Sequence, residues 1–187
     1  MNFKKHSELL GEHAYLSPSK HSWINYEEDK LDSSYRKFRA TQKGTELHDL
    51  ACRCIKLKIK LPKTKQSLNE YVNDAIGYRM TPEQPLYYSV NSFGTTDAIC
   101  FKEKEKLLRI HDLKTGVSLV PMHQLEIYAA LFCLEYGMNP NDIDMELRIY
   151  QSDEIIVSVP SPETILMIMD KIILFDKKIE QIKLEEE

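Results

Sequence analysis

The sequence predicts an α/β protein built on a mixed sheet that is flanked by helices. Three strand-like runs, at 86–90, 93–101 and 107–113, follow one another with only short polar connections. A helical pattern separates them from two further strand-like runs, at 146–150 and 155–159. Strands that alternate with helices in this way form a sheet with helices on both of its faces.

Helical patterns fill most of the remaining sequence. Apolar residues recur at helical spacing over 35–60 and again over 67–76. Pro121 is expected to open a third helix and Gly137 to end it, because proline suits the first turn and glycine the left-handed residue after the last. Ser161 is the predicted N-cap of a final helix, with a proline directly after it in the first turn.

Composition indicates one domain of ordinary size. The chain has 187 residues, of which 42% are hydrophobic and 29% charged, as is typical of soluble globular proteins. We divide it into a helical and loop extension at 1–35, a core at 36–160 and an amphipathic helix at 161–187. There is no apolar run of about 18 residues and no apolar segment of a secretory signal, so we expect no membrane span and a cytoplasmic location.

Two acids and a lysine form the central candidate site. Asp97 lies in the second strand-like run, and Asp112 and Lys114 lie at the end of the third. Adjacent antiparallel strands bring facing side chains to within about 5 Å, so both carboxylates can share one or two divalent cations. Asp112 and Lys114 share one face, while His111 points to the opposite face and Leu113 points into the core. The backbone carbonyl of Leu113 is a candidate further metal ligand.

This set of groups suits the hydrolysis of a phosphodiester. A divalent metal activates a water and neutralises charge on the phosphate. A lysine beside it adds a fixed positive charge close to the same phosphate. The residues therefore predict metal-dependent chemistry on a phosphate ester.

Four motifs occur in a fixed order along the chain. G-T-x-x-H is present at 44–48, G-x-x-D at 94–97, D-x-K at 112–114 and Q-x-x-x-Y at 124–128, after an L-S-P-S at 16–19. Each motif alone is weak, but the ordered set is specific. It resembles the PD-(D/E)xK nuclease superfamily, in its RecB-like and phage exonuclease-like branch. The resemblance covers roughly residues 16–160 and implies the restriction-endonuclease-like core, with the order helix, three strands, helix, strand.

The resemblance implies roles for further residues. His48 would be an additional metal ligand, which suits Mn²⁺ somewhat better than Mg²⁺; the alternative is a capping or surface histidine. Gln124 and Tyr128 lie four residues apart on one helix face, where they would contact the DNA backbone or orient Lys114. For Tyr128, packing of the helix on the sheet is an alternative role.

The four cysteines, at 52, 54, 100 and 133, are expected to be small buried side chains. Some RecB-like relatives hold an iron–sulfur cluster through four cysteines, one before the nuclease core and three near the C-terminus. No cysteine follows Cys133 in this chain, so we expect no cluster.

The expected function is that of a deoxyribonuclease that uses Mg²⁺ or Mn²⁺, and the resemblance implies that its products carry 5′-phosphates. The resemblance favours an exonuclease in phage or bacterial DNA recombination, repair or processing. One alternative is a catalytically silent nuclease fold that acts as a DNA-binding or adaptor protein, although the acid, acid and lysine set is complete. Another is a metal-dependent phosphodiesterase that acts on nucleotides rather than on polymers.

A basic stretch is the candidate DNA contact. The net charge is −4, but affinity for phosphates depends on a local basic surface rather than on the total. Residues 53–65 hold six basic residues and no acid. We predict that Arg53, Lys56, Lys60 and Lys63 contact the DNA backbone; the alternative is a solvated helix face.

The last helix carries an apolar seam. Its members are spaced alternately three and four residues apart: Ile165, Ile168, Ile172, Phe175, Ile179 and Ile182. This is the spacing of a coiled-coil seam, and it is longer than a typical helix. We predict that the second half contacts another copy of the chain or a recombination partner; the alternative is a helix that packs only on its own sheet.

Overall fold

The α/β class is confirmed by the computed structural model, which describes residues 7, 14–116 and 120–186. The chain divides into two compact units, Met1–Thr45 and Glu46–Glu187. The C-terminal helix therefore belongs to the same unit as the sheet. Most of the N-terminal stretch in which we expected no secretory signal lies outside the described residues.

In its described residues, the first unit contains a short 3-10 helix, η2 (Pro18–Asn25), and the beginning of α1 (Glu28–Leu57). The indole N–H of Trp23 donates to the backbone carbonyl of Ser17 at 3.0 Å, so the end of η2 is linked to the residue that precedes it. Three aromatic rings pack together beside it, those of Tyr15, Tyr35 and Phe38.

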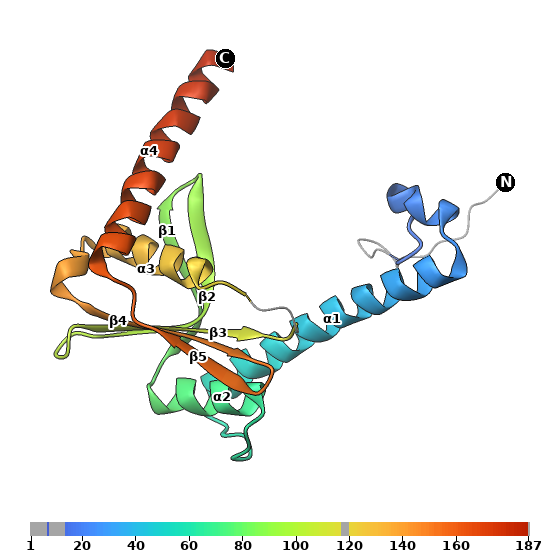
Figure 1. Ribbon diagram of the computed structural model, residues 1–187, viewed down its shortest axis with the longest axis horizontal. Coiled ribbons are helices and arrows are strands. Elements are labelled where there is room, and N and C mark those ends of the chain that lie inside the picture. Colours follow the sequence, from blue (N-terminus) through green and yellow to red (C-terminus); the bar gives the residue numbers. More distant parts are fainter. Residues whose placement is uncertain (1–6, 8–13, 117–119, 187) are drawn as a thin grey trace. The chain divides into compact units, whose positions relative to one another are not determined.

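The second unit is built on a five-stranded sheet with the order β1-β2-β3-β4-β5 (Figure 1). The strands are β1 (Thr81–Ser89), β2 (Ser92–Lys102), β3 (Leu107–Lys114), β4 (Asp144–Gln151) and β5 (Glu154–Ser158). Only β3 and β4 pair in parallel; the other neighbouring strands are antiparallel. The chain between β3 and β4 contains α3 (His123–Tyr136), because parallel neighbours need a long crossover connection.

Helices cover both faces of this sheet (Figure 1). On one face, α2 (Ser67–Gly77) and the end of α1 enclose a core with Ala98, Leu113 and Tyr150. On the other face, α3 and α4 (Pro162–Glu186) pack on alternate residues of the same strands. Strands β2, β3, β4 and β5 therefore contribute residues to both cores, whereas β1 contributes only to the core on the α3 face.

Two predicted helix ends are confirmed in detail. Gly137 follows α3 with a φ of 63°, in the left-handed region that favours glycine. The hydroxyl of Ser161 accepts the backbone N–H of Thr164 at 3.2 Å, which caps the first turn of α4.

Several predicted boundaries are wrong. The first strand begins at Thr81 rather than at residue 86, because prolines in a strand are tolerated at the edge of a sheet, where β1 lies. Helix α1 extends from Glu28 to Leu57 and therefore starts earlier and ends earlier than predicted. Helix α3 begins at His123, so Pro121 precedes it rather than opening it.

Across the described residues, helices either fall short of the bilayer's thickness or carry too much charge to cross it. All four cysteines are free thiols. Cys54 and Cys133 are buried as predicted, whereas Cys52 and Cys100 are partly exposed.

Candidate active site

Three acids occupy facing positions on three neighbouring strands. The β1–β2 register on either side of Glu83 puts it opposite Asp97. The β2–β3 register, continued by one position beyond the ladder, puts Asp97 opposite Asp112. The two carboxylates predicted from the sequence, on β2 and β3, are therefore neighbours. The third carboxylate, that of Glu83 on β1, lies on the other side of Asp97.

The backbone of Glu83 departs from the regular strand. Its φ is 52°, in the left-handed region that non-glycine residues rarely adopt. Such conformations cost free energy and concentrate at functional sites. The departure occurs at the position where β1 faces Asp97, which makes Glu83 a candidate site residue.

Among the described residues, His48, Glu83 and Asp97 form a group that could hold a metal ion. Each offers one ligand atom, and these atoms lie within 4.8 Å of one another. His48 reaches the acids from α1, with its Nδ1 3.4 Å from Oδ2 of Asp97. One imidazole nitrogen and two carboxylate oxygens are ligands that Mn²⁺ accepts, and Mg²⁺ accepts the oxygens.

Asp112 and Lys114 form an ion pair beside this group. The Nζ of Lys114 lies 3.1 Å from Oδ1 and 3.0 Å from Oδ2 of Asp112. Asp112 is only 3% exposed, so the pair is shielded from solvent on the carboxylate side. The prediction that both side chains share one face of β3 is confirmed.

The two motif residues on α3 join the same set of contacts. Lys114 Nζ also donates to Oε1 of Gln124 at 2.9 Å. The side-chain amide of Gln124 in turn donates to the hydroxyl of Tyr128 at 3.5 Å. Gln124 thus contacts Lys114, and its orienting role, which the resemblance implied, stays a prediction.

Tyr128 lies close to the backbone of β2. A Cβ placed on Gly94 would be 3.0 Å from Cε1 of Tyr128, tighter than ordinary contacts. The glycine of the G-x-x-D motif therefore makes room for the tyrosine ring of the Q-x-x-x-Y motif. The packing role considered for Tyr128 and its contact with Gln124 are both present.

Burial and the negative charge of Asp97 raise the pKa values of the two neighbouring carboxylates, Asp112 and Glu83. Burial raises the pKa of Asp112, and the charge of Asp97 raises it further, while Lys114 opposes both effects. Burial and then Asp97 also raise the pKa of Glu83. The hydrogen bond with Asp97 raises the pKa of His48. A divalent cation would relieve this repulsion between partly buried anions.

Glu83 is the site residue that sequence reasoning missed. The predicted first strand, at 86–90, begins just after the run P-E-Q-P at 82–85, and prolines are uncommon within a strand. The turn alone does not reveal the pairing: a hairpin that turns at 90–91 pairs residues whose numbers add to 181, and an irregularity between Tyr87 and Ser89 shifts that sum to 180. That register assigns Glu83 to Asp97.

The remaining predicted residues lie in different places. Leu113 is buried in the core as predicted, and the role of its carbonyl stays a prediction. Arg53 and Lys56 are exposed on α1, whereas Lys60 and Lys63 are exposed in the connection between α1 and α2. Lys60 and Lys63 therefore do not belong to a solvated helix face, which was the alternative interpretation of the basic stretch.

His111 points away from the acids, as predicted. It is fully buried, and its Nδ1 lies 3.2 Å from the hydroxyl of Tyr150. Burial, with the charges of Arg148 and Arg109, lowers the pKa of His111 to about 3. The neutral imidazole is thus part of the core on the α2 face rather than of the site.

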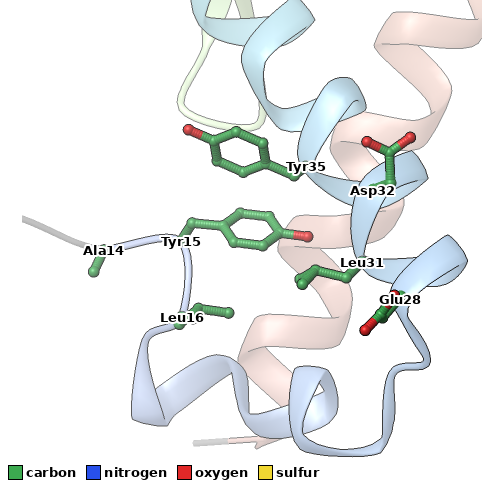
Figure 2. Close-up of a pocket in the computed structure, with 7 residues that line it drawn as sticks. All are labelled: Ala14, Tyr15, Leu16, Glu28, Leu31, Asp32 and Tyr35. Carbon is green, nitrogen blue, oxygen red and sulfur yellow. The ribbon is translucent and has the colours of Figure 1, made fainter.

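A separate cavity of about 620 Å³ lies within the first unit (Figure 2). Figure 2 shows the rings of Tyr15 and Tyr35 and the side chains of Leu16 and Leu31 around it, with two acids nearby. One of these acids, Asp32, is engaged by Arg36 at 2.7 Å. The walls suit an apolar group, and the motif residues of the candidate site do not line it.

Comparison with protein-family models and with curated proteins finds no match for this chain. The interpretation of the site therefore depends on the residues that the fold brings together.

Proposed function

We propose that this chain is a metal-dependent deoxyribonuclease with a restriction-endonuclease-like core. The observation that carries the proposal is the row of Glu83, Asp97 and Asp112 across three strands, with Lys114 paired to the last acid. His48 adds a nitrogen ligand at the other side of Asp97. The element order and the four sequence motifs support the same assignment.

The donor set fits a hard divalent cation. Magnesium binds oxygen ligands at about 2.0–2.1 Å, so ligands on opposite sides of one ion lie about 4.2 Å apart. The candidate ligand atoms of His48, Glu83 and Asp97 lie within 4.8 Å of one another, close to that separation. A bound ion would supply an activated water and positive charge for the scissile phosphate.

The side chains around the ion have separate tasks. Asp97 and Glu83 would hold the cation, and Asp112 would bind it while holding Lys114 in place. Lys114 supplies positive charge where negative charge develops on the phosphate during attack. Gln124 limits the positions that the long lysine side chain can take, so less freedom is lost when substrate binds.

DNA is the proposed substrate and the partner of the basic residues. The positive charge of Lys56 is near enough to Glu83 to oppose the rise in the pKa of that acid, which burial causes. A lysine at this distance can contact a phosphate next to the scissile one. Arg53, Lys60 and Lys63 extend this positive charge along the chain. We propose an exonuclease that leaves 5′-phosphates, and a partner protein on α4 would not change this chemistry.

The direct test is digestion of end-labelled linear DNA and of closed circular DNA, with Mg²⁺, with Mn²⁺ and with a chelator. We expect cleavage of the linear DNA only when a metal is present. Cleavage of the circular DNA, which has no ends, would show that the enzyme is an endonuclease rather than an exonuclease. Calorimetric titration with Mn²⁺ on the same samples separates metal binding from turnover. Metal and DNA binding without any cleavage would establish the silent nuclease fold instead.

A further inference from the structure

The second half of α4 presents an apolar face that the core of its own unit leaves uncovered. The seam residues from Ile165 to Ile172 lie in or against the core formed with α3 and the sheet. Figure 1 shows α4 continuing beyond α3. On this part of the helix Phe175, Ile179 and Ile182 are 57%, 38% and 41% exposed. The seam is therefore used by the core in its first half only.

The β1–β2 hairpin holds this part of α4 in a fixed rotation. Ser89 and Asp176 share a hydrogen bond at 2.5 Å, and the amide of Asn91 donates to Glu180 at 2.6 Å. The Nζ of Lys183 donates to the side-chain amide oxygen Oδ1 of Asn91 at 2.7 Å. Each of these three helix residues comes directly after a seam residue, so the hairpin covers the adjacent face of the helix. The apolar face is left on the outside.

We propose that a second copy of this chain covers this face, with the two α4 helices antiparallel about a two-fold axis. Apolar residues at i, i+4 and i+7 fit another helix that carries the same spacing. Every copy of the chain carries such a helix in the same fixed rotation. A two-fold axis then lets one face meet its own copy in an isologous contact.

Charges beside the seam select the antiparallel orientation. Lys171, Lys178 and Glu185 lie along the flank that is opposite to the one held by the hairpin. In an antiparallel pair centred at residue 178, Lys171 of one copy faces Glu185 of the other, and symmetry makes this contact twice. A parallel pair would instead rely on Asp176 and Lys183, which already bind the hairpin.

The same geometry predicts a dimer of limited affinity. The exposed part of the seam from Phe175 to Ile182 is short, about 12 Å at the rise of an α-helix. Lys178 of each copy lies near the axis and faces its counterpart, which opposes association. We therefore expect a dimer that dissociates on dilution rather than an obligate one.

Sedimentation equilibrium of the full chain over a range of concentrations tests the proposal. The average mass should rise from that of one chain, 21.9 kDa, toward twice that value. Ile179→Asp should raise the dissociation constant about tenfold or more, because a charge replaces a central apolar contact. Leu184→Asp is the matched control: Leu184 is 73% exposed on the same helix but points away from the seam. This control should associate like the parent.

Charge variants test the orientation without placing a charge in the apolar contact. Lys171→Glu and Glu185→Lys should each weaken the dimer, and the double variant should recover the affinity of the parent. Lys178→Gln should strengthen association, because it removes repulsion at the axis. These positions are on the helix surface, so they remain informative if Ile179→Asp does not fold.

The proposal would be overturned if the parent had the mass of one chain at every concentration, or if it formed a complex of three copies. Failure of the double charge variant to recover would overturn the antiparallel arrangement. Manganese titration of each variant gives an independent reading of the sheet. An unchanged metal affinity in a dissociated variant would show that this surface is separate from the proposed nuclease site.

Discussion

The carboxylate of Asp97 accepts the backbone N–H of Leu113 at 2.9 Å, so a side chain of β2 takes the place of the next backbone bond to β3. Leu113 is the residue between Asp112 and Lys114. This one hydrogen bond therefore fixes the position of a candidate ligand relative to the segment that carries the other acid and the lysine.

Glu83→Gln should weaken metal binding without unfolding the chain. The amide keeps the size of the side chain but removes the charge that faces Asp97. We expect a loss of Mn²⁺ affinity of about tenfold or more in calorimetric titration. Glu103→Gln, in the exposed turn after β2, is the matched control and should bind like the parent. Equal affinity in both variants would remove Glu83 from the metal site.

Variants of Asp112 and Lys114 should show that the two residues have different roles, Asp112 as a metal ligand and Lys114 as a source of positive charge. Asp112→Asn is expected to weaken Mn²⁺ binding and abolish cleavage. Lys114→Met keeps the aliphatic chain and removes the charge, so cleavage should fall by about 100-fold or more while metal still binds. Single-turnover cleavage and metal titration check this pair. A loss of metal affinity as large in Lys114→Met as in Asp112→Asn would contradict the roles.

Gly94→Ala should disturb the site through Tyr128. The added methyl group would stand 3.0 Å from the ring, so the ring must move and Gln124 loses its contact. We expect a stability loss of about 1–3 kcal/mol in urea unfolding, together with slower cleavage. Gly77→Ala, where a methyl group meets open space, is the control. Combining Gly94→Ala with Tyr128→Ala should cost less than the two effects added together.

Reversing charge on the basic stretch should weaken DNA binding without affecting the metal. The variant Lys56→Glu, Lys60→Glu, Lys63→Glu is expected to raise the dissociation constant for DNA and to flatten its dependence on salt, because fewer phosphate contacts remain. Lys104→Glu with Lys106→Glu, in the turn between β2 and β3, provides a control far along the strands. Parent-like binding of the triple variant at every salt concentration would place the DNA elsewhere.

Acid should destabilise the fold partly through His111. Its pKa is about 3 in the folded chain because of burial, against about 6.5 when unfolded. Between these values the unfolded chain binds the proton first, so stability falls as the pH falls from about 6.5 toward 3. His111→Phe should reduce this slope by about 1.4 kcal/mol per pH unit in urea unfolding, with no change in slope above pH 7. An identical slope in both proteins would contradict the assignment.

The sequence alone determined the parts of the site that depend on local spacing. Asp112 and Lys114 share a face because they are two residues apart on a strand, and Gln124 and Tyr128 share one because they are four apart on a helix. Asp97 could be placed opposite Asp112 because a short polar turn joins their strands. The class of fold, the caps of two helices and the apolar seam of the last helix follow from equally local signals.

Tertiary structure decided what local spacing leaves open. Prolines hid the start of β1, and only pairing along the sheet edge placed Glu83 beside Asp97. His48 reaches the acids because packing of α1 on the sheet selects one face of a long helix. The seam of α4 has uniform spacing, but α3 and the hairpin determine which half is buried and which face is left outside. Periodicity places a residue on a face, whereas only the packing of elements distant in sequence determines what that face meets.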